Sequence, residues 1–238
     1  MAKLRILASS VLIMLCLSQT SPAAIRLWHW ENTHQLMVQA PPASFGDQLS
    51  GILPDIPDDS TESCLELSNL RLTIHRCEQN NNSLDWQSPE NWKVTEAIQS
   101  DLNRDGASEI AMVVWRLFEP WPIDRFLPNG GRIAEYQNEA GLSAHLILIG
   151  WDGDEYRELW AGSALANPIF KISAIDMDGD GYEELIALEG EYDSPFETGN
   201  ITIWKWQGFG FTLQDRIEGS YSGYAVYRMD QQTIILIY

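Results

Sequence analysis

The sequence predicts an all-β protein built from repeated four-stranded antiparallel sheets. Three observations lead to this fold class. Two acidic stretches, DLNRDGASE and DMDGDGYEE, match each other position by position; each lies between apolar stretches rich in β-branched residues; and a second matching pair of apolar stretches follows them. Self-similarity of this kind is typical of repeat architectures in which each unit is one supersecondary structure.

Each acidic stretch is predicted to connect the first two strands of a unit. WKVTEAI precedes the first stretch and IAMVVW follows it, whereas IFKISAI and LIALEG flank the second. When Asp101 is aligned with Asp176, the glycine at loop position six and the glutamate at position nine coincide. We therefore expect two β-hairpins, in intact units that begin at about residues 92 and 168.

A second hairpin completes each unit. HLILIGWDGDEY, at His145 to Tyr156, matches NITIWKWQGFGF, at Asn200 to Phe211, and the match pairs Trp151 with Trp206. These two copies lie closer together in the sequence than the two acidic loops do. The first unit is therefore predicted to carry an insertion between its second and third strands, at about Phe118 to Ser143.

The insertion is the stretch that least resembles a repeat, and it is rich in aromatic residues and arginine. Two interpretations stay open. Its prolines could fold it back as a plug over the sheets, or it could form a recognition surface, because aromatic residues and arginine dominate binding hot spots. The residues considered for recognition are Trp121, Arg125, Phe126, Arg132 and Tyr136.

A weaker copy of the unit begins at about residue 48. LPDIPDDSTESCLEL aligns with the second acidic stretch when Asp55 takes the first loop position. Pro57 and Ser63 then replace the third and ninth positions, which carry oxygen-rich side chains in the intact loops. We expect this degenerate unit to keep its hairpin and to have lost the chemistry of its loop.

The two ends of the chain resemble complementary half-units. IRLWHWENTHQL matches the third and fourth strands of a unit, and YAVYRMDQQTIILIY matches the first and second strands with a shortened loop. Together they would complete a fourth sheet and close a ring, which removes exposed strand edges. The prediction is a small four-bladed β-propeller closed by its N- and C-terminal strands; an open partial propeller and two stacked sheets are the alternatives.

The alternation of oxygen-bearing residues in the two loops is typical of a calcium site. Side chains at positions one, three and five can point to one centre, a carboxylate at position nine can close the shell, and glycine at position six permits the sharp turn. Two Ca²⁺ sites are predicted. Their side-chain ligands would be Asp101, Asn103, Asp105 and Glu109 in the first loop, and Asp176, Asp178, Asp180 and Glu184 in the second.

The sequence disfavours three other interpretations of these loops. An EF-hand requires flanking helices and a glutamate at position twelve, where this chain has Met112 and Ala187. Magnesium demands stricter octahedral geometry and keeps several waters. The remaining alternative is a pair of solvated Asp-Gly turns without an ion, against which the repulsion between clustered carboxylates argues.

The pattern of strand, D-x-D/N-x-D-G-x-x-E/D loop and strand resembles the FG-GAP or VCBS repeat of integrin-α-like β-propellers, here in a short, secreted, bacterial-type form. The resemblance covers Asp55 to about Gly219 and is strongest at the two intact loops. It implies a propeller in which loops hold structural calcium between the strands of a blade, and it implies that role for the eight residues named above.

Charge and the N-terminal segment indicate where the protein works. The chain has 34 acidic and 15 basic residues, a net charge of −19, which disfavours nucleic acid and anionic membrane surfaces as partners. Residues 1–24 are predicted to be a signal peptide cleaved after Ala23 or Ala24, because Lys3 and Arg5 precede an apolar run and small residues follow it. The apolar run is too short to span a bilayer, which argues against a membrane anchor. A lipid anchor at Cys16 is the lesser alternative. Residues 25–238 would form one secreted, periplasmic or cell-surface domain.

Two cysteines, Cys64 and Cys77, remain after this cleavage. In an oxidising compartment they are predicted to form a disulfide, with two free thiols as the alternative. They flank the hairpin-like stretch LELSNLRLTIHR. A turn at Ser68 and Asn69 would place Cys64 opposite Thr73 rather than opposite Cys77.

Catalytic motifs are missing from the sequence. It contains no nucleophile elbow, no H-E-x-x-H and no phosphate-binding glycine loop, and its four histidines lack metal-ligand spacing. We expect a calcium-binding module, not an enzyme, for extracellular binding or scaffolding, with an unknown protein or glycan as its partner. A polysaccharide-binding or polysaccharide-active protein on the same scaffold is the alternative.

Overall fold

The computed structural model describes residues 26–30, 36–39, 63–76, 84–119, 135–194, 196–229 and 232–238. This part of the chain is all-β, as predicted, and no helix in it has the length and apolarity needed to cross a bilayer. The predicted signal peptide, the degenerate loop at Asp55 and residues 120–134 of the insertion lie outside the described residues.

In the part of the chain that the structure describes, the strands form four separate antiparallel sheets rather than two stacked ones. The first sheet has the order β3-β4-β5, the second β6-β7-β8-β9, the third β10-β11-β12-β13 and the fourth β14-β15-β1-β2. The strands are β1 (Arg26–Trp30), β2 (Leu36–Gln39), β3 (Ser63–Ser68), β4 (Arg71–Arg76), β5 (Leu84–Gln87), β6 (Lys93–Ser100), β7 (Glu109–Leu117), β8 (Leu142–Trp151), β9 (Tyr156–Ala161), β10 (Ile169–Ile175), β11 (Glu184–Glu189), β12 (Gly199–Trp206), β13 (Phe211–Tyr221), β14 (Tyr224–Met229) and β15 (Gln232–Ile237).

The second and third sheets repeat one another in register. Ser100 pairs with Glu109 across the first acidic loop, and Ile175 pairs with Glu184 across the second. At the other hairpin, Trp151 pairs with Tyr156 and Trp206 with Phe211. Both of these shorter turns contain a left-handed glycine, Gly153 at φ 106° and Gly208 at φ 82°. Equivalent sequence positions therefore occupy equivalent places in the two sheets.

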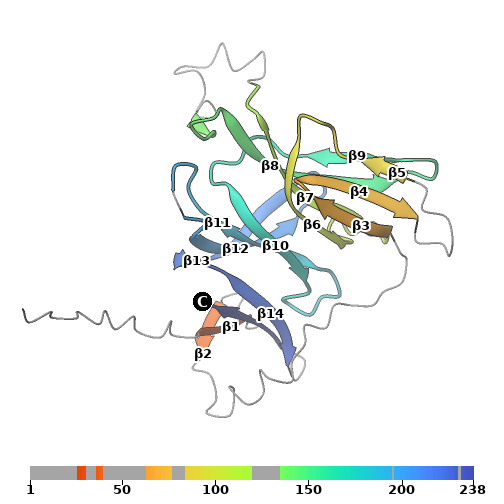
Figure 1. Ribbon diagram of the computed structural model, residues 1–238. Coiled ribbons are helices and arrows are strands. Elements are labelled where there is room, and N and C mark those ends of the chain that lie inside the picture. The colour runs from red at the N-terminus through yellow and green to blue at the C-terminus, as the bar shows by residue number, and fades with distance from the viewer. Residues whose placement is uncertain are drawn as a thin grey trace, which may run out of the picture.

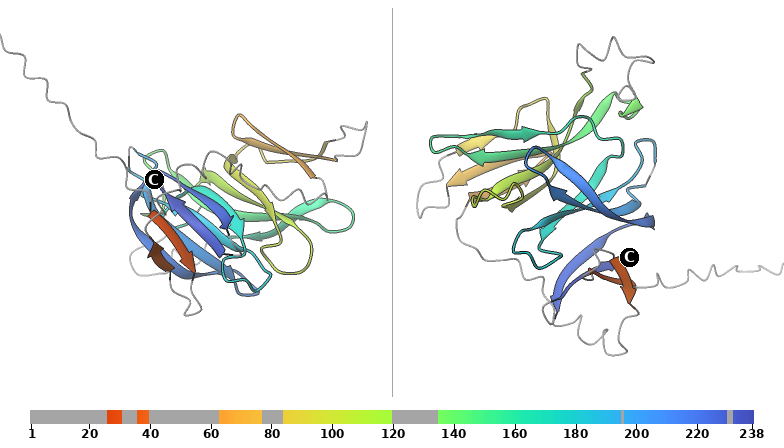
Figure 2. Two further views of the ribbon diagram at one scale, coloured as in Figure 1. Left: turned by 90° about the horizontal axis from the view of Figure 1, so that it is seen from below. Right: turned by 180° about the vertical axis from the view of Figure 1, so that it is seen from behind.

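The fourth sheet joins the N-terminal strands β1 and β2 to the C-terminal strands β14 and β15, as the half-unit prediction requires. β1 pairs antiparallel with β15, with Arg26 opposite Ile237 and His29 opposite Ile234. Figure 2 shows the red-orange strands β1 and β2 beside the blue C-terminal strands. The order β14-β15-β1-β2 assigns the C-terminal hairpin to the first two strand positions and the N-terminal hairpin to the last two.

Successive sheets share apolar cores. One cluster joins Leu72 and Ile74 of the first sheet to β6, β7 and β8 of the second. Another joins the second and third sheets, and a further one packs Tyr224, Ile235 and Ile237 of the fourth sheet against the third. The sheets thus follow one another from β3 to β14 in Figure 1. Closure of the ring between the fourth and first sheets stays a prediction.

The turn between β3 and β4 differs from the predicted one, which was at Ser68 and Asn69. It is formed by Asn69 and Leu70, both at positive φ (53° and 61°), one position later than expected. Cys64 therefore lies opposite His75, and Thr73 lies opposite Glu66. Cys77 falls outside the described residues, so the disulfide stays a prediction.

Candidate metal centre

The two acidic loops adopt the same backbone-capping pattern. In the first loop, which connects β6 and β7, Gly106 N–H donates to Asp101 Oδ2 (2.9 Å) and Ala107 N–H donates to Asp105 Oδ1 (2.9 Å). Asp105 N–H donates to Asn103 Oδ1 (2.9 Å). Side chains at positions one, three and five therefore fold inward over the loop, because the loop's own N–H groups hold them there.

The second loop, between β10 and β11, repeats these contacts. Gly181 N–H donates to Asp176 Oδ2 (3.0 Å), Asp180 N–H to Asp178 Oδ1 (3.1 Å) and Tyr182 N–H to Asp180 Oδ1 (2.9 Å). The glycine at position six is left-handed in both loops, with φ 91° at Gly106 and 87° at Gly181. Any other residue would be strained in this conformation, which explains the glycine.

The glutamate at position nine of each loop is buried beneath the loop. Glu109 and Glu184 begin β7 and β11 and are 1% and 2% exposed. Glu109 Oε2 accepts from Asn103 N–H (3.3 Å), and Glu184 Oε2 accepts from Met177 N–H (2.9 Å). Burial, reinforced by the nearby Asp105 and Asp101 carboxylates, raises the pKa of Glu109 to about 7. Without a cation, its charge is therefore costly.

Three carboxylates converge in each loop. One group is Asp101, Asp105 and Glu109, and the other is Asp176, Asp178 and Glu184; in each, one oxygen per residue lies within 4.8 Å of the others. Calcium–oxygen distances of about 2.3–2.6 Å place ligands of one ion at separations up to about this value. Each group of carboxylates could therefore hold a metal ion.

The two other predicted ligands take different positions. Asn103 lies over the first loop, where its amide donates to Asp105 Oδ2 (3.0 Å). Asp180 lies in the second loop outside the converging trio, and its Oδ2 is 2.8 Å from Lys205 Nζ and 3.5 Å from Arg104 Nη1. Hydrogen bonding and charge attraction from Lys205 lower the pKa of Asp180 despite its partial burial.

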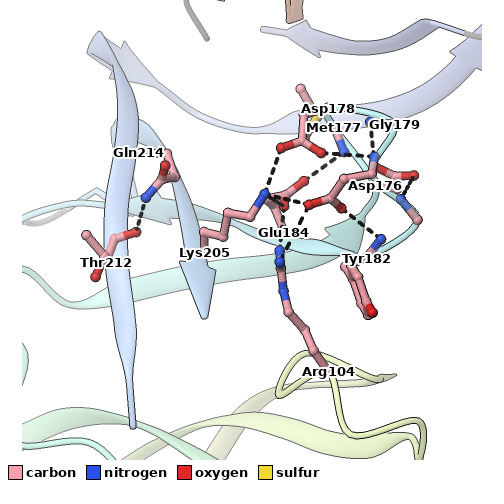
Figure 3. A network of polar contacts seen from close by, with 12 residues as sticks. Arg104, Asp176, Met177, Asp178, Gly179, Tyr182, Glu184, Lys205, Thr212 and Gln214 are labelled. Atoms are coloured by element: carbon pink, nitrogen blue, oxygen red, sulfur yellow. Dashed lines mark hydrogen bonds and ion pairs between the residues drawn. The ribbon is translucent and has the colours of Figure 1, made fainter. Parts of the chain in front are cut away.

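Sequence reasoning missed the basic residues of the second loop. Figure 3 shows Lys205 from β12 and Arg104 from the first loop, both directed at the carboxylates. Arg104 Nη2 lies 3.0 Å from Glu184 Oε1, and its guanidinium lies 4.8 Å from the Tyr182 ring centroid. The sequence did contain a sign of this difference. When the hairpin at His145 to Tyr156 is aligned with the one at Asn200 to Phe211, Gly150 takes the position of Lys205.

The two loops also contact each other. Arg104 occupies the fourth position of the first loop at φ 67°, and the equivalent Gly179 has φ 76°. From this left-handed position the Arg104 side chain crosses to Glu184 on the next sheet. The Ser100 hydroxyl, at the end of β6, donates to the Glu183 carboxylate of the second loop. An ion in either loop would therefore act on the contact between the second and third sheets.

No protein-family model matches the chain, and no curated protein matches it either. The resemblance to FG-GAP or VCBS repeats therefore stays a prediction. The metal assignments depend on the geometry of the loops.

A buried serine–histidine pair lies away from the loops, on β8. Ser143 Oγ is 2.8 Å from His145 Nε2, and His145 Nδ1 is 3.0 Å from the Gly162 carbonyl oxygen. Since a carbonyl only accepts, Nδ1 carries the proton and Nε2 accepts from Ser143. Ser143 is 0% and His145 7% exposed, so the pair is a packed hydrogen-bonded unit without an open face for substrate.

His145 predicts an acid-sensitive contribution to stability. Burial lowers its pKa, with the Arg116 charge adding to the effect, so the folded state binds this proton less readily than the unfolded chain does. The contribution of His145 to the free energy of unfolding should therefore decrease as pH falls through about 6.5, the pKa of an unfolded histidine. Urea unfolding of the wild type and of His145→Gln at pH 7.5 and 5.0 measures this contribution.

His145→Gln is the control for that experiment. It removes the imidazole proton, whereas Glu109 and Glu184, whose pKa values burial raises, titrate equally in both proteins. The difference in stability between variant and wild type should shrink at pH 5.0. A difference that is the same at both pH values would contradict the assignment.

The tryptophans Trp160, Trp204 and Trp206 pack against the apolar core shared by the second and third sheets. Trp204 Nε1 donates to Glu189 Oε1 (2.8 Å) within the third sheet. Trp160 and Trp206, from neighbouring sheets, meet edge-to-face with centroids 5.7 Å apart, and Phe211 contacts both. Trp151 is 42% exposed and lies edge-on to Tyr156. Of the insertion's candidate recognition residues, the structure describes Tyr136 alone, and it is half-buried.

Proposed function

We propose that this protein is a secreted calcium-binding, β-propeller-like module for extracellular binding or scaffolding. One observation supports the proposal most strongly: the first loop gathers Asp101, Asp105 and the buried Glu109 around one centre. Within the described residues, no lysine or arginine forms an ion pair with these three carboxylates. Clustered, partly buried carboxylates are stabilised by a cation, and calcium suits an irregular all-oxygen shell.

Calcium would act structurally rather than catalytically. Bound at the first loop, it would favour the ionised form of Glu109 and tie the start of β7 to the preceding loop. Because Arg104 of this loop reaches Glu184 of the next sheet (3.0 Å), the same ion would fix the relative position of two sheets. A protein of this kind stays ordered where calcium is abundant and presents its sheet edges and loops to a partner.

Calcium titration by isothermal calorimetry tests the proposal. The full-length mature protein, freed of metal by chelation, is expected to bind Ca²⁺ in preference to Mg²⁺, because the loop supplies many oxygens without octahedral constraint. Asp105→Ala should weaken the tightest binding event at least about tenfold by removing one charged ligand. Absence of calcium binding to the folded wild-type protein would refute the proposal.

The partner is proposed to be an extracellular protein or a glycan. The acidic surface disfavours nucleic acid. For a glycan, stacking on an open aromatic face would be the expected mode, whereas Trp160 and Trp206 are half-buried and edge-on to each other. A glycan array separates the alternatives: binding or turnover of a polysaccharide would favour the polysaccharide-active alternative.

A further inference from the structure

The second loop differs from the first because it contains its own positive charges. The Lys205 ammonium lies 2.7 Å from Asp178 Oδ2, 2.8 Å from Asp180 Oδ2 and 3.4 Å from Glu184 Oε1. Its side chain is 18% exposed and that of Glu184 is 2% exposed. One nitrogen thus contacts three of the four carboxylates that were predicted to surround a calcium ion (Figure 3).

Two arginines add to this charge. Arg104 of the first loop places Nη2 3.0 Å from Glu184 Oε1 and Nη1 3.5 Å from Asp180 Oδ2. Arg228 of β14 lies 4.0 Å from Asp176 Oδ2, although its side chain is 60% exposed. The second loop is therefore neutralised from three directions by side chains of the same molecule.

Among the described residues, the first loop has no counterpart of Lys205. The aligned position on β8 is Gly150, where an added Cβ would lie 3.7 Å from Glu109 Cγ. A Cβ placed on Gly150 would lie 2.3 Å from Leu159 Cδ1, so Leu159 fills the space that a longer side chain would need. The position aligned with Leu159 is Gln214, which lines the small hollow beside Lys205 and leaves room for it.

We propose that Lys205 is a built-in counter-ion that competes with a divalent cation for the second loop, so that the two loops bind calcium with unequal affinity. An ammonium and a calcium ion that share the same oxygens repel each other, and calcium must displace the ammonium before its shell can close. The first loop takes up calcium without such a competitor. This inference rests on the proposed calcium binding for the first loop, and goes beyond it for the second.

Isothermal calorimetry with Lys205→Met tests the competition. Methionine keeps most of the side-chain volume and removes the charge. The metal-free wild-type mature protein should show one tight Ca²⁺ event, whereas Lys205→Met should show a second one, at least about tenfold tighter than any second event in the wild type. Lys93→Met, which removes an exposed lysine at the start of β6, is the matched control and should leave the titration unchanged.

Substitutions within each loop show which loop produces each calcium-binding event. They do not require that Lys205→Met folds. In the wild-type background, Asp101→Asn should remove the tight event and Asp178→Asn should leave it within about twofold. Two equally tight events in the wild type would overturn the inference. So would loss of the tight event with Asp178→Asn, or a folded Lys205→Met protein that gains no site.

The outcomes also separate this inference from the proposed function. If the wild type binds no calcium while Lys205→Met does, the counter-ion role stands and the proposed calcium binding of the first loop fails. If neither protein binds calcium, both fail.

Discussion

Calcium is expected to raise the melting temperature of the chelated protein by about 5–10 °C. A cation at one hundred times its dissociation constant adds about 2.7 kcal/mol to the free energy of unfolding. For a domain of this size, each kcal/mol corresponds to about 2–4 °C. The gain arises at the first loop, where Glu109 is 1% exposed and the carboxylates of Asp105 and Asp101 converge on it. Thermal unfolding followed by circular dichroism, with chelator and then with excess calcium, measures the shift.

Asp101→Ala provides the control for that melting experiment. Asp101 is one of the three converging carboxylates, and it also accepts hydrogen bonds from the backbone N–H groups of Asp105 and Gly106. The variant should melt lower than the wild type in chelator and should gain less than about 2 °C from calcium. If the wild type melts at the same temperature with and without calcium, the structural role of the ion is wrong.

Tyr224→Ala is expected to lower the free energy of unfolding by about 3–5 kcal/mol, the range for truncating a large buried aromatic residue. Tyr224, on β14, is 0% exposed and packs in the cluster shared by the third and fourth sheets. Its hydroxyl donates to the Ile186 carbonyl oxygen of β11 (2.8 Å). The residue therefore links the sheet of β14, β15, β1 and β2 to the third sheet.

Tyr224→Phe separates packing from hydrogen bonding at this position. It keeps the ring and removes only the hydroxyl, so its cost should be about 1 kcal/mol. Urea unfolding of the two variants measures both effects. Similar losses for phenylalanine and alanine would mean that the ring contributes little to the contact between the sheets.

The repeat pattern predicted much of the fold because the strands and the turns between them are encoded in short stretches of sequence. The two acidic loops sit in the same register, Ser100 with Glu109 and Ile175 with Glu184. The terminal half-units pair as expected, since β1 and β15 are adjacent. Both results depend on apolar alternation and turn residues, which a sequence contains directly.

The site was predicted less completely, because its basic residues come from elsewhere in the chain. Arg104 belongs to the first loop and contacts the second, and Lys205 reaches the second loop from β12. A loop motif identifies the candidate ligands within the loop. It does not show which side chains of neighbouring strands or loops contact those ligands. The turn of the β3–β4 hairpin was misplaced for a different reason: Leu70 adopts a left-handed conformation that leucine rarely takes.

A crystal structure of the protein grown in calcium tests the central claim most directly. We expect a calcium ion at the first loop, with oxygens of Asp101, Asp105 and Glu109 at about 2.3–2.6 Å from it. A first loop whose carboxylates bind only water or a basic side chain, in crystals containing excess calcium, would contradict it.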